Sequence, residues 1–83
     1  MQVSLHVSSG TNNIGIGYQS GQSVGTGSNN TIIGGQAGSF VSNQSNNTLI
    51  GKSDNVSTTS ISGATAIRAN AIANASNQVM IGT

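Results

Sequence analysis

The sequence predicts an all-β fold in which short coils stack on one another as a β-solenoid of about five coils. A motif of two asparagines, a short aliphatic run and a glycine recurs every 17 residues, around Ile16, Ile33 and Ile50. A fixed short period is the signature of a repeat architecture, in which each unit stacks on a copy of itself. The chain also contains no proline and very few charges, which suits coils that pair through backbone hydrogen bonds.

The composition argues against a compact globular domain with its own large core. Ser, Thr, Asn and Gly make up more than half of the 83 residues, with one Tyr, one Phe, no Trp and no Cys. A chain this small usually needs disulfides, a metal ion or self-association to supplement its core. Disulfides and a zinc site are excluded by the absence of cysteine and the single histidine. We therefore expect self-association to bury the remaining apolar surface.

The N-terminal segment differs from the rest. Residues 2–8 alternate between aliphatic and polar side chains, which predicts a short half-buried strand. We assign residues 1–9 to this strand and its connector, and residues 10–83 to the repeats. His6 falls on the polar side of the strand, so we expect it to face solvent; a metal ion shared by copies of His6 on an oligomer axis is the alternative.

The repeats that follow have 17-residue coils as far as Ile67 and then one 14-residue coil that ends near Ile81. Each coil begins with a short strand whose side chains alternate between two faces. In the second coil, Thr31 and Ile33 share one face and Ile32 takes the other. One aliphatic face fills the interior of the coil, and the other needs an external partner. The expected core and interface ladder comprises Ile16, Ile32, Ile33, Leu49, Ile50, Ile67, Met80 and Ile81.

Asparagine and glycine mark the turns of each coil. Asparagine tolerates unusual backbone angles, and asparagines stacked in register can form hydrogen-bonded amide ladders. The expected turn and ladder residues are Asn12, Asn13, Asn29, Asn30, Asn46, Asn47, Gly17, Gly34, Gly51 and Gly82. Arg68 occupies the glycine position of its coil, which predicts an altered turn there. The Ala-rich segment 64–75 has helical propensity, but Ile67 keeps the 17-residue phase, so we favour continued coils.

Residues 13–21 and 27–38 resemble the repeats of phage tail fibres and of fibre-like proteins of large algal viruses. Residues 66–71 and 79–82 are similar to the shorter head repeats of trimeric autotransporter adhesins. This resemblance covers roughly residues 10–83. It implies a left-handed parallel β-roll, a homotrimer around a common axis, and a bulge of about three residues in the longer coils.

The same resemblance implies a structural role in an attachment fibre, as adhesin head or spacer. The expected location is the virion surface or the extracellular or cell surface. The expected partners are other fibre or virion structural proteins and a host-surface glycan or receptor.

The sequence offers little for catalysis or for charged ligands. It has one carboxylate side chain, one histidine, no glutamate and no cysteine, so we expect no enzymatic activity, no cofactor and no metal site. The net charge of +1 is too small for nucleic-acid binding, and no apolar stretch is long enough to insert into a membrane. Gly15 and Gly17 do not complete a phosphate-binding motif. Lys52 and Asp54 are expected to form a weak surface pair.

Alternative functions remain open on the sequence alone. A flat solenoid face suits a glycan- or ice-binding module, and Thr31, Thr48 and Thr65 form one column of the kind that ice-binding solenoids display. Tyr18 is a candidate for surface recognition, and the alternative is that it packs at a coil corner or oligomer interface. We expect Phe40 to pack at a coil corner or oligomer interface. A self-assembling extracellular filament is the third alternative.

Overall fold

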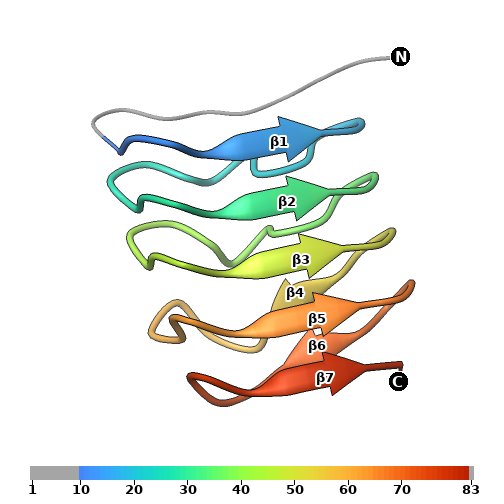
Figure 1. Ribbon diagram of the computed structural model, residues 1–83. Coiled ribbons are helices and arrows are strands. Elements are labelled where there is room, and N and C mark those ends of the chain that lie inside the picture. Colours follow the sequence, from blue (N-terminus) through green and yellow to red (C-terminus); the bar gives the residue numbers. More distant parts are fainter. Residues whose placement is uncertain (1–9, 83) are drawn as a thin grey trace.

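The computed structural model describes residues 10–82, which form a β-solenoid of about four turns with parallel strands (Figure 1). The strand predicted at residues 2–8 and His6 lie outside the described residues. Successive coils lie directly beneath one another, so residues 17 apart in the sequence become neighbours along the stack.

Within residues 10–82, seven short strands build the solenoid. A five-stranded parallel sheet has the order β1-β2-β3-β5-β7, and a two-stranded parallel sheet pairs β4 with β6. The strands are β1 (Ile14–Ile16), β2 (Thr31–Ile33), β3 (Thr48–Ile50), β4 (Asn55–Val56), β5 (Thr65–Ile67), β6 (Ile72–Ala73) and β7 (Val79–Ile81).

The register of the large sheet follows the repeat in the sequence. Ile16 pairs with Ile33, Ile33 with Ile50, and Ile50 with Ile67, each 17 residues further on. Ile67 then pairs with Ile81 after only 14 residues. The prediction of stacked parallel coils is therefore confirmed. The Ala-rich segment contributes β5 and β6, so it forms coils and not a helix.

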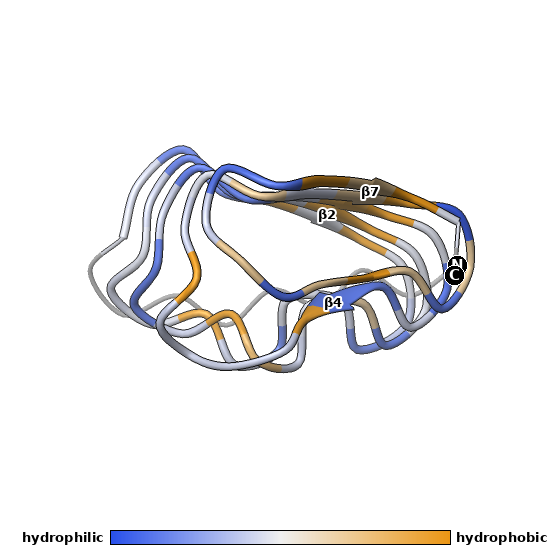
Figure 2. Ribbon diagram, turned by 90° about the horizontal axis from the view of Figure 1, so that it is seen from below, coloured by the Kyte–Doolittle hydropathy of each residue, from blue (hydrophilic) through white to orange (hydrophobic). Residues whose placement is uncertain are grey.

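The interior of the solenoid is narrow, and its core cluster is aliphatic. The central residues of the strands point inward, and Ile32, Leu49 and Ala66 are fully buried. Val41 and Val56 are also fully buried in the same cluster. Viewed along the stack, each coil is a flattened loop with the large sheet on one side and β4 on the other (Figure 2). Small aliphatic residues suffice as a core because the two walls lie close together.

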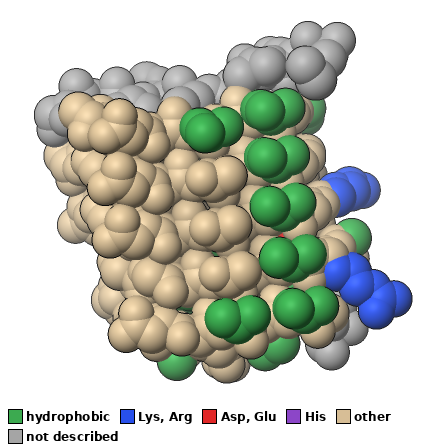
Figure 3. Space-filling view, in the orientation of Figure 1, with side chains coloured by type: hydrophobic (Ala, Val, Ile, Leu, Met, Phe, Trp, Pro, Cys, Tyr) green, Lys and Arg blue, Asp and Glu red, His purple; other side chains and the backbone are tan. Residues whose placement is uncertain are grey.

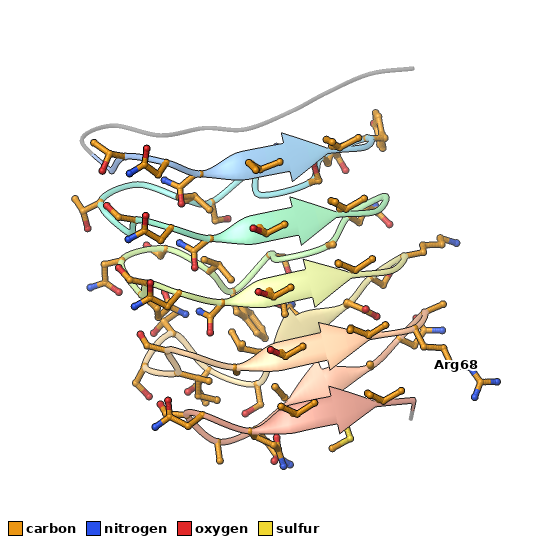
Figure 4. All side chains as sticks on the ribbon, in the orientation of Figure 1. Arg68 is labelled. Carbon is orange, nitrogen blue, oxygen red and sulfur yellow. The ribbon has the colours of Figure 1, made fainter. Side chains whose placement is uncertain are left out.

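The turn after each strand of the large sheet requires a positive φ. Gly34 adopts φ 134°, and a Cβ at this position would collide with the carbonyl group of Gly51 in the next coil. Arg68, at the equivalent position, adopts φ 95°. Its backbone N–H still donates to Ile50 O at 3.0 Å, so the altered turn expected at Arg68 is wrong. The positive φ strains the backbone of Arg68 by an amount on the order of 1–2 kcal/mol, which the fold tolerates. The side chain of Arg68 extends away from the ribbon (Figure 4).

Candidate functional site

The most conspicuous surface of the molecule is the outer face of the five-stranded sheet, which we call the isoleucine face. Strand residues alternate, so the first and third residues of each strand point outward while the second is inside. One column along this face is made only of isoleucine: Ile16, Ile33, Ile50, Ile67 and Ile81. The neighbouring column comprises Ile14, Thr31, Thr48, Thr65 and Val79.

The isoleucine face leaves a large apolar area in contact with water. Ile16 and Ile50 are each 38% exposed, Ile67 is 37% exposed and Ile81 is 71% exposed. Hydrophobic side chains form a continuous stripe along the stack in the space-filling view, and the lysine and arginine atoms lie at its side edge (Figure 3). Neither column contains a charged residue. Contiguous exposed apolar patches on soluble proteins usually mark interaction sites.

An internal ladder of asparagine side chains connects the coils behind this face. Asn13 Oδ1 accepts from Asn30 N at 3.0 Å, and Asn30 Oδ1 accepts from Asn47 N at the same distance. Each side-chain amide also donates to a carbonyl group near the end of its coil, as Asn47 Nδ2 does to Ile61 O at 2.9 Å. Asn30 and Asn47 are fully buried. The second asparagine of each pair therefore satisfies buried backbone groups of two coils at once.

The first asparagine of each pair has a different role. Asn12, Asn29 and Asn46 adopt φ values of 60°, 61° and 65°, in the left-handed region, and their side chains are exposed. Asparagine enters this region more readily than most residues. These residues turn the chain into the strand. At the other end of the strand, the positive φ values belong to Gly17, Gly34, Gly51 and Gly82.

A serine ladder runs beside the asparagines, and we did not predict it. Ser28 N donates to Ser45 Oγ at 3.0 Å, Ser45 N to Ser62 Oγ at 3.2 Å, and Ser62 N to Ser76 Oγ at 3.1 Å. The signal is present in the sequence, because these serines follow the same steps of 17, 17 and 14 residues. The high frequency of serine elsewhere in the chain hides it.

The single carboxylate side chain lies inside the solenoid. Asp54 is fully buried, and the surface pair expected between Lys52 and Asp54 is wrong. Asp54 Oδ1 accepts from Ala71 N at 2.9 Å, whereas Oδ2 has no hydrogen-bond partner. Burial raises the pKa of Asp54 above its ordinary value of 3.8, and hydrogen bonds from the Ala71 and Asn70 backbone oppose the increase. The equivalent residues of neighbouring coils are Ala37 and Ala71, which need no partner.

Replacing Asp54 with alanine is expected to stabilise the protein at neutral pH by about 1–3 kcal/mol, because it removes a buried and incompletely paired carboxyl group. In the native protein, Asp54 is still protonated in the folded state at pH values where the same carboxyl group has ionised in the unfolded state. The free energy of unfolding should therefore be highest below pH 3.8 and fall as the pH rises from 3.8 to the raised pKa of the folded state. Urea denaturation at pH 3 and pH 7 measures this fall. A fall of equal size in Asp54→Ala would contradict the assignment to Asp54.

The two aromatic side chains are both on the surface. Tyr18 is 54% exposed and Phe40 is 48% exposed. Tyr18 follows the turn at Gly17, and its carbonyl group accepts from Gln36 N at 2.7 Å. Phe40 lies away from the large sheet, and its backbone N–H donates to Asn55 Oδ1 at 3.0 Å. Each aromatic side chain therefore keeps about half of its surface in contact with water in the single chain.

The described residues do not bring together three or more His, Cys, Asp or Glu side chains that could hold a metal ion. Within residues 10–82 there is also no helix with the length and apolar character needed to cross a membrane. Comparisons with protein-family models, curated protein sequences and solved structures gave no match to this chain.

Proposed function

We propose that this chain is a structural segment of an attachment fibre on a virion or cell surface, and that it works as a homotrimer with the three isoleucine faces at a common axis. The observation that carries the proposal is the uncharged column of five isoleucines on the outside of the sheet. In a single chain, Ile16, Ile50, Ile67 and Ile81 remain at least 37% exposed to water.

The gain from covering this face is substantial for a protein of this size. Full burial of an isoleucine side chain is worth about 1.5–3 kcal/mol, so each side chain that is about 38% exposed has roughly 0.5–1 kcal/mol to gain. The gain recurs on every coil and in every copy. Stacked repeats derive much of their stability from such recurring interfaces.

A second and third copy of the same chain are the partners that this face fits best. Parallel strands place its rungs about 4.8 Å apart, and only a surface with the same rung spacing can match it along its whole length. Another copy of the chain has the same spacing between its strands, because it has the same fold. The absence of charge from both columns means that identical faces meet without repulsion.

Other features support the fibre assignment. In Figure 1 the front strands run from left to right while the chain returns behind them and descends, which supports the left-handed sense of the coil. The resemblance of residues 13–21 and 27–38 to viral fibre repeats supports a location on the virion or cell surface. On this proposal the partners along the fibre are other fibre or virion structural proteins, and the fibre attaches to a host-surface receptor.

The mass of the native protein in solution tests the proposal. Sedimentation equilibrium should give three times the chain mass of 8.2 kDa. A monomer that stays monomeric at high concentration would overturn the trimer. A mass that keeps growing with concentration would point to the filament alternative.

The threonine column favours a second candidate function, which is binding to ice. Thr31, Thr48 and Thr65 pair in register and are half-buried beside the isoleucine column on one flat sheet. Ice binding needs this face free, whereas trimerisation covers it. A monomeric mass together with thermal hysteresis of the purified protein would therefore select ice binding over the fibre.

A further inference from the structure

A polar groove is formed by residues outside the isoleucine face. It has a volume of about 410 Å³ and is open to solvent. β4 contributes Asn55 to the groove and forms the far wall of the flattened coil (Figure 2). Three successive coils line it, through Gln19, Gln22 and Ser23, then Gln36 and Ser39, then Ser53 and Asn55.

Hydrogen bonds between coils hold the walls of the groove in place. Gln36 Nε2 donates to Gln19 Oε1 at 3.3 Å, and both residues sit at turns with φ near 60°. On the other side, Asn55 Nδ2 donates to Ser39 Oγ at 2.7 Å, while Asn55 Oδ1 accepts from the backbone of Phe40. A ligand in this groove would meet groups that are already ordered, which lowers the entropic cost of binding.

The chemistry of the lining selects the kind of ligand. Every side chain in the groove is a carboxamide or a hydroxyl, and none is charged. Within the described part of the chain, the side chains of Gln22, Ser23 and Ser53 make no hydrogen bond, so their donors and acceptors are available. Pockets for drug-like molecules are mostly apolar, whereas this groove is polar. Nucleic-acid sites require cationic side chains, and the groove lining contains none.

We propose that this groove binds an uncharged oligosaccharide. Sugar hydroxyls donate and accept hydrogen bonds, as do the carboxamide and hydroxyl groups of the lining. Phe40 and Tyr18 are half-exposed and adjoin the lining residues Ser39 and Gln19 in the chain, and aromatic rings of this kind pack against the C–H face of a sugar. None of the lining residues belongs to the isoleucine face, so the site does not use the surface that we propose for the trimer axis.

Substitutions at one repeat position give a matched test of the site. Ser23 lines the groove, Phe40 occupies the same repeat position in the next coil, and Ser57 occupies it in the coil after that. The backbone of this position therefore accepts phenylalanine. Ser23→Phe should fill the groove, whereas Ser57→Phe adds the same ring to an exposed position that does not line it.

The experiment starts with the native protein on an array of neutral and acidic oligosaccharides, followed by calorimetric titration of the strongest neutral sugar. We expect binding that Ser23→Phe abolishes and Ser57→Phe leaves unchanged. Gln22→Ala should weaken it about tenfold, as the loss of one or two hydrogen bonds predicts. Circular dichroism of all three variants verifies the fold.

Three results would overturn the proposal. The first is the absence of binding to any neutral oligosaccharide at millimolar concentration. The second is equal affinity in Ser23→Phe and Ser57→Phe. The third is binding of acidic sugars alone, which would indicate the exposed Lys52 and Arg68 in place of the groove.

Discussion

Replacing Asn47 with glycine is expected to destabilise the folded protein by about 2–6 kcal/mol. Asn47 is fully buried; its Oδ1 accepts from Ala64 N and its Nδ2 donates to Ile61 O, both at 2.9 Å. The substitution leaves a buried donor and a buried acceptor without partners, and each such group costs about 1–3 kcal/mol. Urea denaturation at a fixed protein concentration measures the change.

Asn46 provides the matched control for this prediction. It is exposed and has φ 65°, a conformation that glycine adopts without strain, and Gly63 fills the same repeat position in the next coil with φ 70°. Asn46→Gly should therefore change the free energy of unfolding by less than about 0.5 kcal/mol. If the two variants were equally stable, the amide ladder would not be what connects the coils.

The second large effect is expected at the isoleucine face, where Ile50→Asp should abolish trimer formation. In a symmetric trimer the substitution would bring three carboxylates close to one axis, in a region with little water. Burying unpaired charges is costly, and like charges in proximity repel each other. Sedimentation equilibrium should show the mass falling from three chains to one.

Ile72→Asp is the control for charge and for loss of an isoleucine. Ile72 lies in β6, outside the large sheet, and is 47% exposed, compared with 38% for Ile50. This variant should keep the mass of the native protein. A trimer that survived Ile50→Asp, or that was lost equally in both variants, would contradict a trimer axis at the isoleucine face.

The repeat in the sequence was sufficient to predict the stacked parallel coils. Because residues 17 apart pair in the large sheet, aligning the motif also aligns the strands, and alternation along Thr31–Ile33 then separates an inner from an outer aliphatic column. The inner column follows from Ile32 and Leu49, and the outer one from Ile33 and Ile50. The repeat period predicts which residues pair, because in a parallel stack residues one period apart in the sequence lie opposite each other in neighbouring strands.

Features that depend on a single coil could not be predicted in this way. Asp54 was expected on the surface because it is charged, yet its repeat position, shared with Ala37 and Ala71, places it inside. Arg68 was expected to alter its turn, but the hydrogen bonds of neighbouring coils impose the positive φ on it. In both cases the stack overrides the preference of the individual residue. The polar groove had no signal in the sequence, because it is formed by side chains of three coils.

The 17-residue step has a consequence for how this protein can vary in size. Each coil offers the next one the same amide, hydroxyl and backbone groups that it received from the one before. Duplicating or deleting one whole repeat would thus create no new kind of contact, and it would change the height by a single increment of about 4.8 Å. The number of repeats encoded in the sequence therefore sets the length of the solenoid.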